Sequence, residues 1–513
     1  MKKLFLIAVI LIVCVWTEVA YCPPAPTPSQ PVKGGILKCI RGAFPKVIGY
    51  PPEFGASDGI FAQLVIERLM TWDEKGNMIP VLADTWEGDP VNKTLTFYLK
   101  KGIKFHDGSD FNAEVARWNF QLTADAGRLP NLKSLEVVDN YTIKLYLKDY
   151  DRTVWETYGQ GIAMISPTAF NNAGGGDKEK SKAWARTHPV GTGPFKLADF
   201  QRDVVIKYEK NENYWRKGMP YLAGIEIRCI PDNMTASAMM QAKEADMWLE
   251  PSLIQNVIDL EKKGFKINWG PGMLISLLPY SNDPNSPVAD KNVRAAVKYA
   301  LNRPAMAEML GSGKHEPLTQ MVGKAFLGYV PGYDLQPYNP DKAKKLLAEA
   351  GYPSGLRIPL FATERDRDIA TAVQAFLVDV GFKVDLDIAD YGRYIASVYG
   401  GTGWKGLAIG MSGINPSATD LFTHFGPNPQ TFRFGIKKSP EYLAACDQAL
   451  HTYDNTAVTA KYQAIVKQAG EDSMVIPLWR AAQAVVMQPY VHSNYIKIHT
   501  IIWNSYEDWM EKH

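Results

Sequence analysis

Short stretches of alternating apolar and polar residues predominate between residues 70 and 187, and they predict a mixed unit rich in antiparallel strands. Residues 93–105 (KTLTFYLKKGIKF) alternate in this way and predict a hairpin with a turn at Lys100–Gly102. Residues 135–149 predict a second strand pair, and residues 112–122 have the apolar spacing of a helix. We therefore expect this part of the chain to form one antiparallel-rich unit.

The rest of the chain combines helical spacing with short apolar strands. Apolar residues recur at helical spacing from Phe61 to Leu69 and predict a helix there. Strands alternate with helices over residues 190–250, which predicts a mainly parallel α/β sheet, and a second α/β pattern covers residues 292–414. Residues 475–487 (VIPLWRAAQAVVM) predict a further strand pair near the C-terminus. The predicted fold class is therefore α/β.

The N-terminus has the pattern of a secretion signal. Two lysines precede an apolar run, Leu4–Trp16, which is too short to span a bilayer comfortably and has the length of a signal peptide. Cys22 follows as a candidate lipidation site, although Tyr21 stands where a lipoprotein signal has a small residue. The Pro-rich stretch after it suits an extended tether. A short membrane anchor that stays attached is the alternative.

Three cysteines remain beyond the signal segment: Cys39, Cys229 and Cys446. None lies in a CxxC motif or at zinc-ligand spacing from a histidine. Cys39 and Cys229 lie in apolar stretches that predict buried strands. A disulfide between them and two free thiols are both compatible with this pattern, and we favour free thiols.

Composition narrows the class of protein. The chain has 513 residues, 46 % hydrophobic and 21 % charged, as in soluble globular proteins, and its length predicts two or three domains. A net charge of +2 gives no support for a nucleic-acid partner. The HExxH and P-loop patterns do not occur in the sequence, and the one GxSxG match, GASDG at residues 55–59, does not directly follow a predicted strand, as a nucleophile elbow requires. We therefore expect no enzyme activity and no cofactor, and a secreted α/β hydrolase is the alternative from a different class.

Six stretches, in this order, carry a family resemblance. They are PVLADTWEGDPVNKTLTFYLKKGIKFHDGSDFNAEVARWNF (80–120), HPVGTGPFKLADF (188–200), YEKNENYWRKGMPYLAGIEIRCIPD (208–232), VADKNVRAAVKYALNR (288–303), YNPDKAKKLLAEAGYP (338–353) and EDSMVIPLW (471–479). With them, the chain resembles family 5 of the solute-binding proteins of ABC importers, the peptide/nickel class.

The resemblance implies a type II periplasmic-binding-protein fold with two lobes, an extra inserted domain and a hinge near Asn282 and Ile476. The implied division is a signal peptide and lipidation site (1–22), a Pro-rich linker (23–33), lobe I (34–69, 188–281 and 476–513), an inserted domain of lobe I (70–187) and lobe II (282–475).

The resemblance also implies a function. The protein would capture a peptide or another small oligomeric solute between its lobes and deliver it to a membrane permease and its ATPase. It would be a monomer in the periplasm or outside the cell, anchored to the outer face of the cytoplasmic membrane by a lipid or by its export signal. An oligosaccharide and a nickel chelate are alternative solutes within the family.

Three loops at strand ends are expected to hold the solute. Arg365 and Arg367 are candidates to pair with a carboxylate, and the aromatic residues are candidates to stack on sugar rings or aromatic side chains. The full set of candidate ligand-binding residues is Phe44, Tyr50, Arg365, Arg367, Trp404, Met411, Ser412, Gly413, Ile414, Asn415 and Trp479.

One of these positions departs from the family pattern. In peptide-binding relatives, the second loop carries an aspartate that pairs with the α-amine of the peptide. Here Ile414 stands at that position, and Asp420 lies six residues further on. A charged amine closed into a dry cleft without its partner costs several kcal/mol. The departure therefore favours a neutral oligomer, such as a sugar, or an anionic or amidated ligand.

The same loop region bears on metal binding. The nickel-binding branch of the family uses a histidine and a nickel chelate, and His424 follows the second loop. It is the one weak metal candidate, since the eight histidines show no clustering at metal-ligand spacing. We expect no bound metal.

Overall fold

The computed structural model describes residues 30–73, 77–324, 326–333, 338–413, 420–427, 432–496 and 502–511. The expected signal peptide, Cys22 and the linker up to residue 29 lie outside these residues and stay predictions. The chain divides into two units, residues 1–31 and 32–513, and the second is described below.

A mixed sheet of eleven strands forms the centre of the described part of this unit. Its order is β15-β14-β16-β12-β17-β11-β1-β10-β9-β8, with β13 beside β17. The strands are β1 (Ile36–Arg41), β8 (Phe195–Gln201), β9 (Val205–Lys210), β10 (Gly224–Cys229), β11 (Met247–Leu249), β12 (Lys266–Pro279), β13 (Glu316–Pro317), β14 (Leu356–Thr363), β15 (Phe382–Ala389), β16 (Leu407–Ser412) and β17 (Ile476–Met487).

The prediction of a mainly parallel sheet is wrong. Strand β1 is parallel to β10 and β11, and β14 is parallel to β15 and β16, but the other pairings are antiparallel. The reason is that β8, β9 and β10 pair antiparallel with one another within the stretch of the prediction, and that β12 and β17 also run antiparallel to their neighbours in the middle of the sheet. The α/β fold class itself is confirmed.

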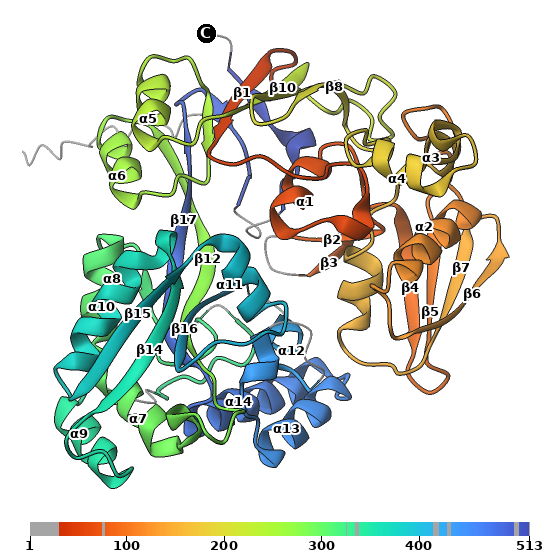
Figure 1. Ribbon diagram of the computed structural model, residues 1–513. Coiled ribbons are helices and arrows are strands. Elements are labelled where there is room, and N and C mark those ends of the chain that lie inside the picture. The colour runs from red at the N-terminus through yellow and green to blue at the C-terminus, as the bar shows by residue number, and fades with distance from the viewer. Residues whose placement is uncertain are drawn as a thin grey trace, which may run out of the picture. The chain divides into compact units, whose positions relative to one another are not determined.

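Strands β12 and β17 are the longest antiparallel pair, and Figure 1 shows them running alongside each other. Lys266 pairs with Met487 at one end and Leu277 with Ile476 at the other. The predicted strand pair at 475–487 is therefore wrong, because β17 is one continuous strand. Its polar centre, Arg480–Gln483, interrupts the apolar run in the sequence but stays paired with β12.

The pairing of these two strands has an irregularity at Gly272. The register shifts between Pro271 and Leu274, and a Cβ at Gly272 would lie 2.3 Å from the carbonyl oxygen of Ala481. Any side chain there would push the two backbones apart. The glycine is thus required by the close approach of β12 to β17.

We expect Gly272→Ala to lower the free energy of unfolding by about 1–3 kcal/mol, because a Cβ overpacks a backbone contact that cannot move freely. Denaturant unfolding of both proteins measures the change. Gly413→Ala is the matched control, since a Cβ at Gly413 has no atom within 4 Å. Equal losses in the two variants would contradict this explanation.

Residues 83–147, within the stretch expected to be an inserted domain, form a separate antiparallel sheet in the order β4-β5-β7-β6. The predicted pair at 135–149 is confirmed as β6 and β7, and the helix predicted at 112–122 as α2. The hairpin predicted at 93–105 is wrong, because β5 pairs with β4 and β7 instead. The strands of this sheet and of two small sheets are β2 (Met70–Trp72), β3 (Met78–Pro80), β4 (Ala83–Asp89), β5 (Thr94–Leu99), β6 (Leu132–Asp139), β7 (Thr142–Leu147), β18 (Val491–His492) and β19 (Trp509–Met510).

The helix predicted from Phe61 to Leu69 is also wrong. Helix α1 ends at Ala62, and the next residues are held by backbone hydrogen bonds from another part of the chain. Gly193 N donates to Val65 O at 2.9 Å, and Phe195 N donates to Leu64 O at 3.1 Å. These tertiary hydrogen bonds replace the helical ones that the apolar spacing suggested.

Several of the helices begin at a residue whose side chain accepts a hydrogen bond from a backbone N–H of the first turn. Asn112 accepts from Val115 N, and Asn339 accepts from Lys342 N. The helices are α1 (Ala56–Ala62), α2 (Ala113–Asp125), α3 (Pro167–Gly174), α4 (Lys178–Ala185), α5 (Asn233–Gln241), α6 (Ile254–Lys262), α7 (Lys291–Ala300), α8 (Arg303–Gly311), α9 (Pro340–Glu349), α10 (Arg367–Val378), α11 (Tyr391–Val398), α12 (Asp420–Phe425), α13 (Pro440–Leu450) and α14 (Asn455–Glu471).

The three described cysteines are free. Cys39 and Cys229 lie on the adjacent parallel strands β1 and β10, where Cys39 is opposite Ile227 and Cys229 is opposite Arg41. The two sulfurs are therefore offset by two positions along the sheet. The preferred expectation of free thiols agrees with this arrangement.

Distinct apolar cores support the different parts of the chain. One core lies under β1 and α1, a second packs between the β4–β7 sheet and α2, and others lie beneath β14–β16 and α13–α14. The lobe and domain boundaries expected from the sequence stay predictions.

Candidate functional site

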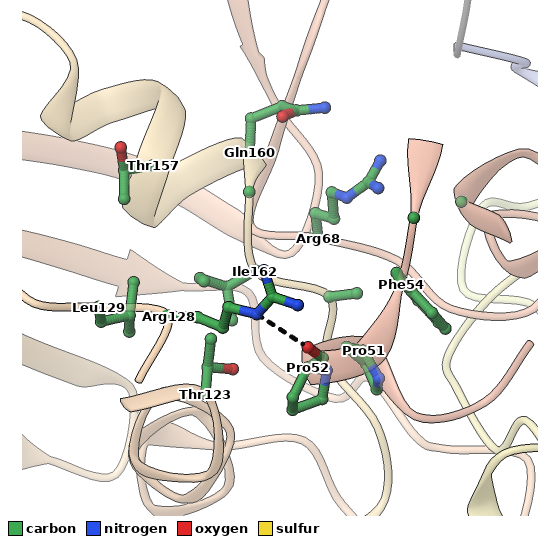
Figure 2. Close-up of a pocket in the computed structure, with 14 residues that line it drawn as sticks. Pro51, Pro52, Phe54, Arg68, Thr123, Arg128, Leu129, Thr157, Gln160 and Ile162 are labelled. Carbon is green, nitrogen blue, oxygen red and sulfur yellow. Dashed lines mark hydrogen bonds between the residues drawn. The ribbon is translucent and has the colours of Figure 1, made fainter. Parts of the chain in front are cut away.

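A cavity of about 370 Å³ lies among segments that come before residue 164. The short helical turn η1 (Pro51–Glu53) and α1 form one side, and the end of α2 with the π-helical turn η2 (Trp155–Gln160) forms the other (Figure 2). Its lining residues are Pro51, Pro52, Phe54, Gly55, Gly59, Arg68, Thr123, Arg128, Leu129, Thr157, Gln160, Gly161, Ile162 and Ala163.

Local hydrogen bonds fix the rim of this pocket. Asp58, a buried residue of α1, accepts from the backbone N–H groups of Gly55 and Lys46, both at 2.8 Å. A carboxylate in the first turn of a helix is well placed to accept such bonds. On the facing side, Arg68 forms an isolated antiparallel bridge with Ala163. The pocket walls are thus held by backbone contacts.

Arg68 is the main charged group in the pocket. Its side chain is half-buried, and its Nε is fully enclosed without a hydrogen-bond partner among the described residues. Desolvation by burial lowers the pKa of the guanidinium to about 10. The lowered pKa means that removal from water disfavours the charged form, and no carboxylate among the described residues offsets the effect.

Two further polar side chains face the same space. Gln160 is 6 % exposed, and its Nε2 has no hydrogen-bond partner in the described part of the chain. Arg128 is exposed and donates from Nε to the carbonyl oxygen of Pro52 at 3.2 Å, the dashed line in Figure 2. The pocket therefore presents N–H donors and positive charge.

The first expected ligand loop lies beside this pocket but does not line it. Phe44 is partly buried and meets Phe61 edge to face, with ring centroids 5.8 Å apart. Tyr50 is 4 % exposed and stacks on Phe170 at 6.1 Å. Both rings are thus in contact with the core under β1 and α1, and their role in ligand binding stays a prediction.

The third loop places its two arginines in different settings. Arg365 is exposed, whereas Arg367 forms a two-pronged ion pair with Glu364, at 2.7 and 2.6 Å. Asp366 between them is buried and accepts from Thr363 Oγ1 at 2.6 Å. Arg365 therefore has the more available guanidinium, and neither arginine is tested as a ligand contact.

The second loop follows β16. Met411 is partly buried, Ser412 is 2 % exposed, and its Oγ has no hydrogen-bond partner within the described ranges. Gly413 has open space where a Cβ would lie. Ile414 and Asn415 lie outside the described residues, so the departure from the family aspartate stays a sequence prediction.

Trp404 and Trp479 lie in the interior. Trp404 is 6 % exposed and donates from Nε1 to Leu278 O at 3.0 Å. Trp479 is 1 % exposed in β17, and the His315 ring stacks on it at 5.8 Å. Protein atoms surround both indoles here, and their proposed stacking on a ligand stays untested.

His424 lies in the short helix α12, with its ring 6.2 Å from that of Phe425. In the described part of the chain, no three His, Cys, Asp or Glu side chains are grouped so that they could hold a metal ion. None of the helices among the described residues is long and apolar enough to cross a membrane.

A polar contact joins Asp149 and Arg152, which follow β7, to the turn between α13 and α14. Asp149 Oδ2 lies 3.1 Å from His451 Nε2, and Arg152 donates to the carbonyl oxygens of Thr452 and Tyr453 at 3.0 and 3.1 Å. Hydrogen bonds and ion pairs of this kind can be broken and remade at modest cost, in contrast to a packed apolar interface.

Sequence reasoning missed the pocket residues Arg68, Arg128 and Gln160. Arg68 falls in a stretch expected to be helical, and single arginines and glutamines carry no motif. The fourteen residues that line this pocket include no aspartate or glutamate, and this is visible only once distant segments are brought together.

Comparison with known proteins identifies the family. The model of the bacterial extracellular solute-binding proteins, family 5 (middle), matches residues 77–433. The glutathione-binding protein GsiB of Shigella flexneri serotype 5b is 30 % identical over 440 residues, which cover 81 % of this chain and 83 % of that protein. GsiB of Escherichia coli K12 is 29 % identical over 439 residues, with the same coverage.

Solved structures agree on the fold. The Helicobacter pylori periplasmic binding protein DppA, in complex with the peptide STSA, matches with a TM-score of 0.82 at 22 % identity, over 94 % of this chain and 99 % of that one. NikA of Brucella suis, in complex with Fe(III)-EDTA, matches with a TM-score of 0.80 at 22 % identity, over 92 % and 100 %. The expected type II periplasmic-binding-protein fold is confirmed. The chain belongs to family 5 of the bacterial extracellular solute-binding proteins, the substrate-binding components of ABC importers.

Proposed function

We propose that this chain captures a peptide or a similarly small oligomeric solute between lobe I and lobe II and delivers it to an ABC permease, without catalysing a reaction. The observation that carries the proposal is the pair of strands β12 and β17. Each is continuous, and their pairing is irregular only near Gly272 and Ile275. Two paired strands resist stretching but allow bending, which suits closure of lobes around a bound solute.

The solutes bound by the relatives narrow the range of solutes that we propose for this chain. GsiB is a glutathione-binding protein, DppA holds a peptide and NikA holds a ferric EDTA chelate. All three solutes are small and polar, and each carries carboxylate groups. We place the solute of this chain in the same range, with Phe44, Arg365, Ser412 and the loop from 413 to 415 as the proposed contacts.

The location belongs to the same proposal. Residues 1–21 would direct export, Cys22 would carry a lipid, and the Pro-rich stretch would act as a tether to the outer face of the cytoplasmic membrane. The folded part would act as a monomer. The export pattern of the sequence and the extracellular family support this placement.

A thermal-shift panel tests solute capture. We expect glutathione, short peptides or a ferric EDTA chelate to raise the melting temperature of the purified chain, because a ligand that binds only the folded form stabilises it. At 100 times the dissociation constant, the gain is about 2.7 kcal/mol. A melting temperature that no member of the panel changes, together with native mass spectra that show no bound solute, would contradict the proposal.

A further inference from the structure

We propose that the pocket between α1 and η2 receives the carboxylate of the captured solute, with Arg68 and Gln160 as the groups that bind it and an apolar body lying against the pocket walls. This inference rests on the proposed function, and it adds the chemical class of the solute and the residues that select it.

The charge balance of the pocket favours an anion. Its fourteen lining residues include two arginines and no aspartate or glutamate. The side chain of Arg68 forms no hydrogen bond or ion pair with the residues that the structure describes, its Nε is enclosed, and burial lowers the pKa of the guanidinium. Enclosed arginines in folded proteins are normally paired, because an unpaired charge away from water is costly. A ligand carboxylate would supply the missing partner.

The side chain of Gln160 provides a second, independent reason to expect a ligand in this pocket. It is 6 % exposed, and its Nε2 is enclosed without an acceptor among the described residues. In Figure 2, the amide of Gln160 and the guanidinium of Arg68 extend to the same side of the pocket, whereas Arg128 turns toward Pro52. A carboxylate has two oxygens with several acceptor positions, so it can satisfy both donors.

The pocket walls define the rest of the ligand. Pro51, Pro52, Phe54, Leu129 and Ile162 are apolar and line the same space. A cavity of about 370 Å³ lies within the size range of small-molecule sites, which are mostly apolar with a few placed polar groups. The arrangement therefore fits a carboxylate on an apolar group of about the size of an amino-acid side chain.

Two probes that differ only in charge test the proposal. N-acetyl-leucine carries a carboxylate, and N-acetyl-leucinamide has the same body with a neutral amide. We expect calorimetric titration of the full chain to show saturable binding of the acid and at least tenfold weaker binding of the amide. Equal binding of the two probes, or no binding of either, would overturn the proposal.

Three variants locate the site. We expect Arg68→Met to weaken binding of the acid on the order of 10- to 100-fold, the range for a lost hydrogen bond to a charged group. Gln160→Leu should weaken it severalfold. Gly59→Leu should block the pocket, since a Cβ at Gly59 would point at Arg68 Nη2, 3.7 Å away. Arg117→Met, on the exposed face of α2 where Arg117 pairs with Glu114, is the matched control and should bind as wild type.

Stability separates a binding role for Arg68 from a structural one. Because Arg68 has no partner in the described chain, Arg68→Met should have an unchanged or higher melting temperature without ligand. A melting temperature lowered by several degrees would show that Arg68 supports the fold and would overturn its role here. If peptides stabilise wild type and Arg68→Met equally, solute capture stands and the carboxylate pocket fails.

Discussion

The contribution of Asp508 to the free energy of unfolding is expected to fall as the pH rises from about 4 to about 8. Asp508 lies between the turn Ser505–Glu507 (η6) and β19, is fully buried and accepts from Trp503 Nε1 at 2.6 Å. Burial raises the pKa of this carboxyl to about 8, against an ordinary value of 3.8. Between those values, the folded chain holds a proton that the unfolded chain has lost.

The sign follows from proton binding. Stability from a raised pKa is fully present below the unfolded value and is lost as the pH rises through the folded value, by about 1.4 kcal/mol per pH unit. Asp508→Asn mimics the protonated form and does not titrate. We expect the free energy of unfolding of the variant to rise relative to that of wild type between pH 4 and 8, by an amount on the order of 5 kcal/mol near pH 8.

Other buried groups act in the opposite direction, so the measurement is the difference between the two proteins. Burial lowers the pKa of His106 to about 4, and it lowers that of Lys298 to about 7. Each makes the folded chain bind fewer protons than the unfolded chain and so adds stability as the pH rises. His106 and Lys298 contribute equally to wild type and Asp508→Asn. Their contributions therefore drop out when the unfolding free energies of the two proteins, measured with denaturant from pH 4 to 8, are subtracted. Parallel pH curves would show that Asp508 is ionised in the folded protein.

Loss of the Arg294 guanidinium is expected to cost about 3–5 kcal/mol of unfolding free energy. Arg294 in α7 is 5 % exposed and donates to four backbone carbonyl oxygens, at 2.8 to 3.2 Å. The acceptors are the carbonyl oxygens of Val288, Ala289, Asp472 and Ser473. Arg294 therefore ties the start of α7 to the end of α14.

Arg294→Leu fills similar space but leaves these carbonyl oxygens enclosed without donors. The denaturant concentration at the midpoint of unfolding should fall, and the slope of the unfolding free energy against denaturant concentration should stay unchanged. Arg357→Leu is the matched control, because Arg357 lies on the exposed face of β14 and pairs there with Asp385. We expect a change within about 0.5 kcal/mol for the control. A similar loss in both variants would show that side-chain bulk, and not the hydrogen bonds to these four carbonyl oxygens, accounts for the effect.

The sequence predicts those parts of the fold whose pattern is local. Helices α2 and α9 have an asparagine cap and a regular apolar face, and the pair β6 and β7 alternates over its whole length. The prediction at Phe61–Leu69 failed because its residues bond to the backbone of residues 193 and 195, which are far away in sequence. Such long-range pairing leaves no periodic trace in a single segment.

The candidate site was less accessible to sequence reasoning. The order of family stretches identified the family, and it directed attention to the loops after β1, β14 and β16. Arg68 and Gln160 lie outside those loops, and their side chains are ordinary in composition. What distinguishes them is that Arg68 Nε and Gln160 Nε2 are enclosed without a hydrogen-bond partner among the described residues, a property of the assembled walls and not of either segment alone.

The position of β17 in the chain has a consequence for biosynthesis. This strand ends 26 residues before the C-terminus, yet it lies between β12 and β11 near the centre of the large sheet. While the ribosome is still making the chain, β11 and β12 have no strand between them, and both expose unpaired backbone edges. The sheet can therefore close only after residues 476–487 have been synthesised, so the nascent protein stays incompletely folded and dependent on protection from aggregation until then.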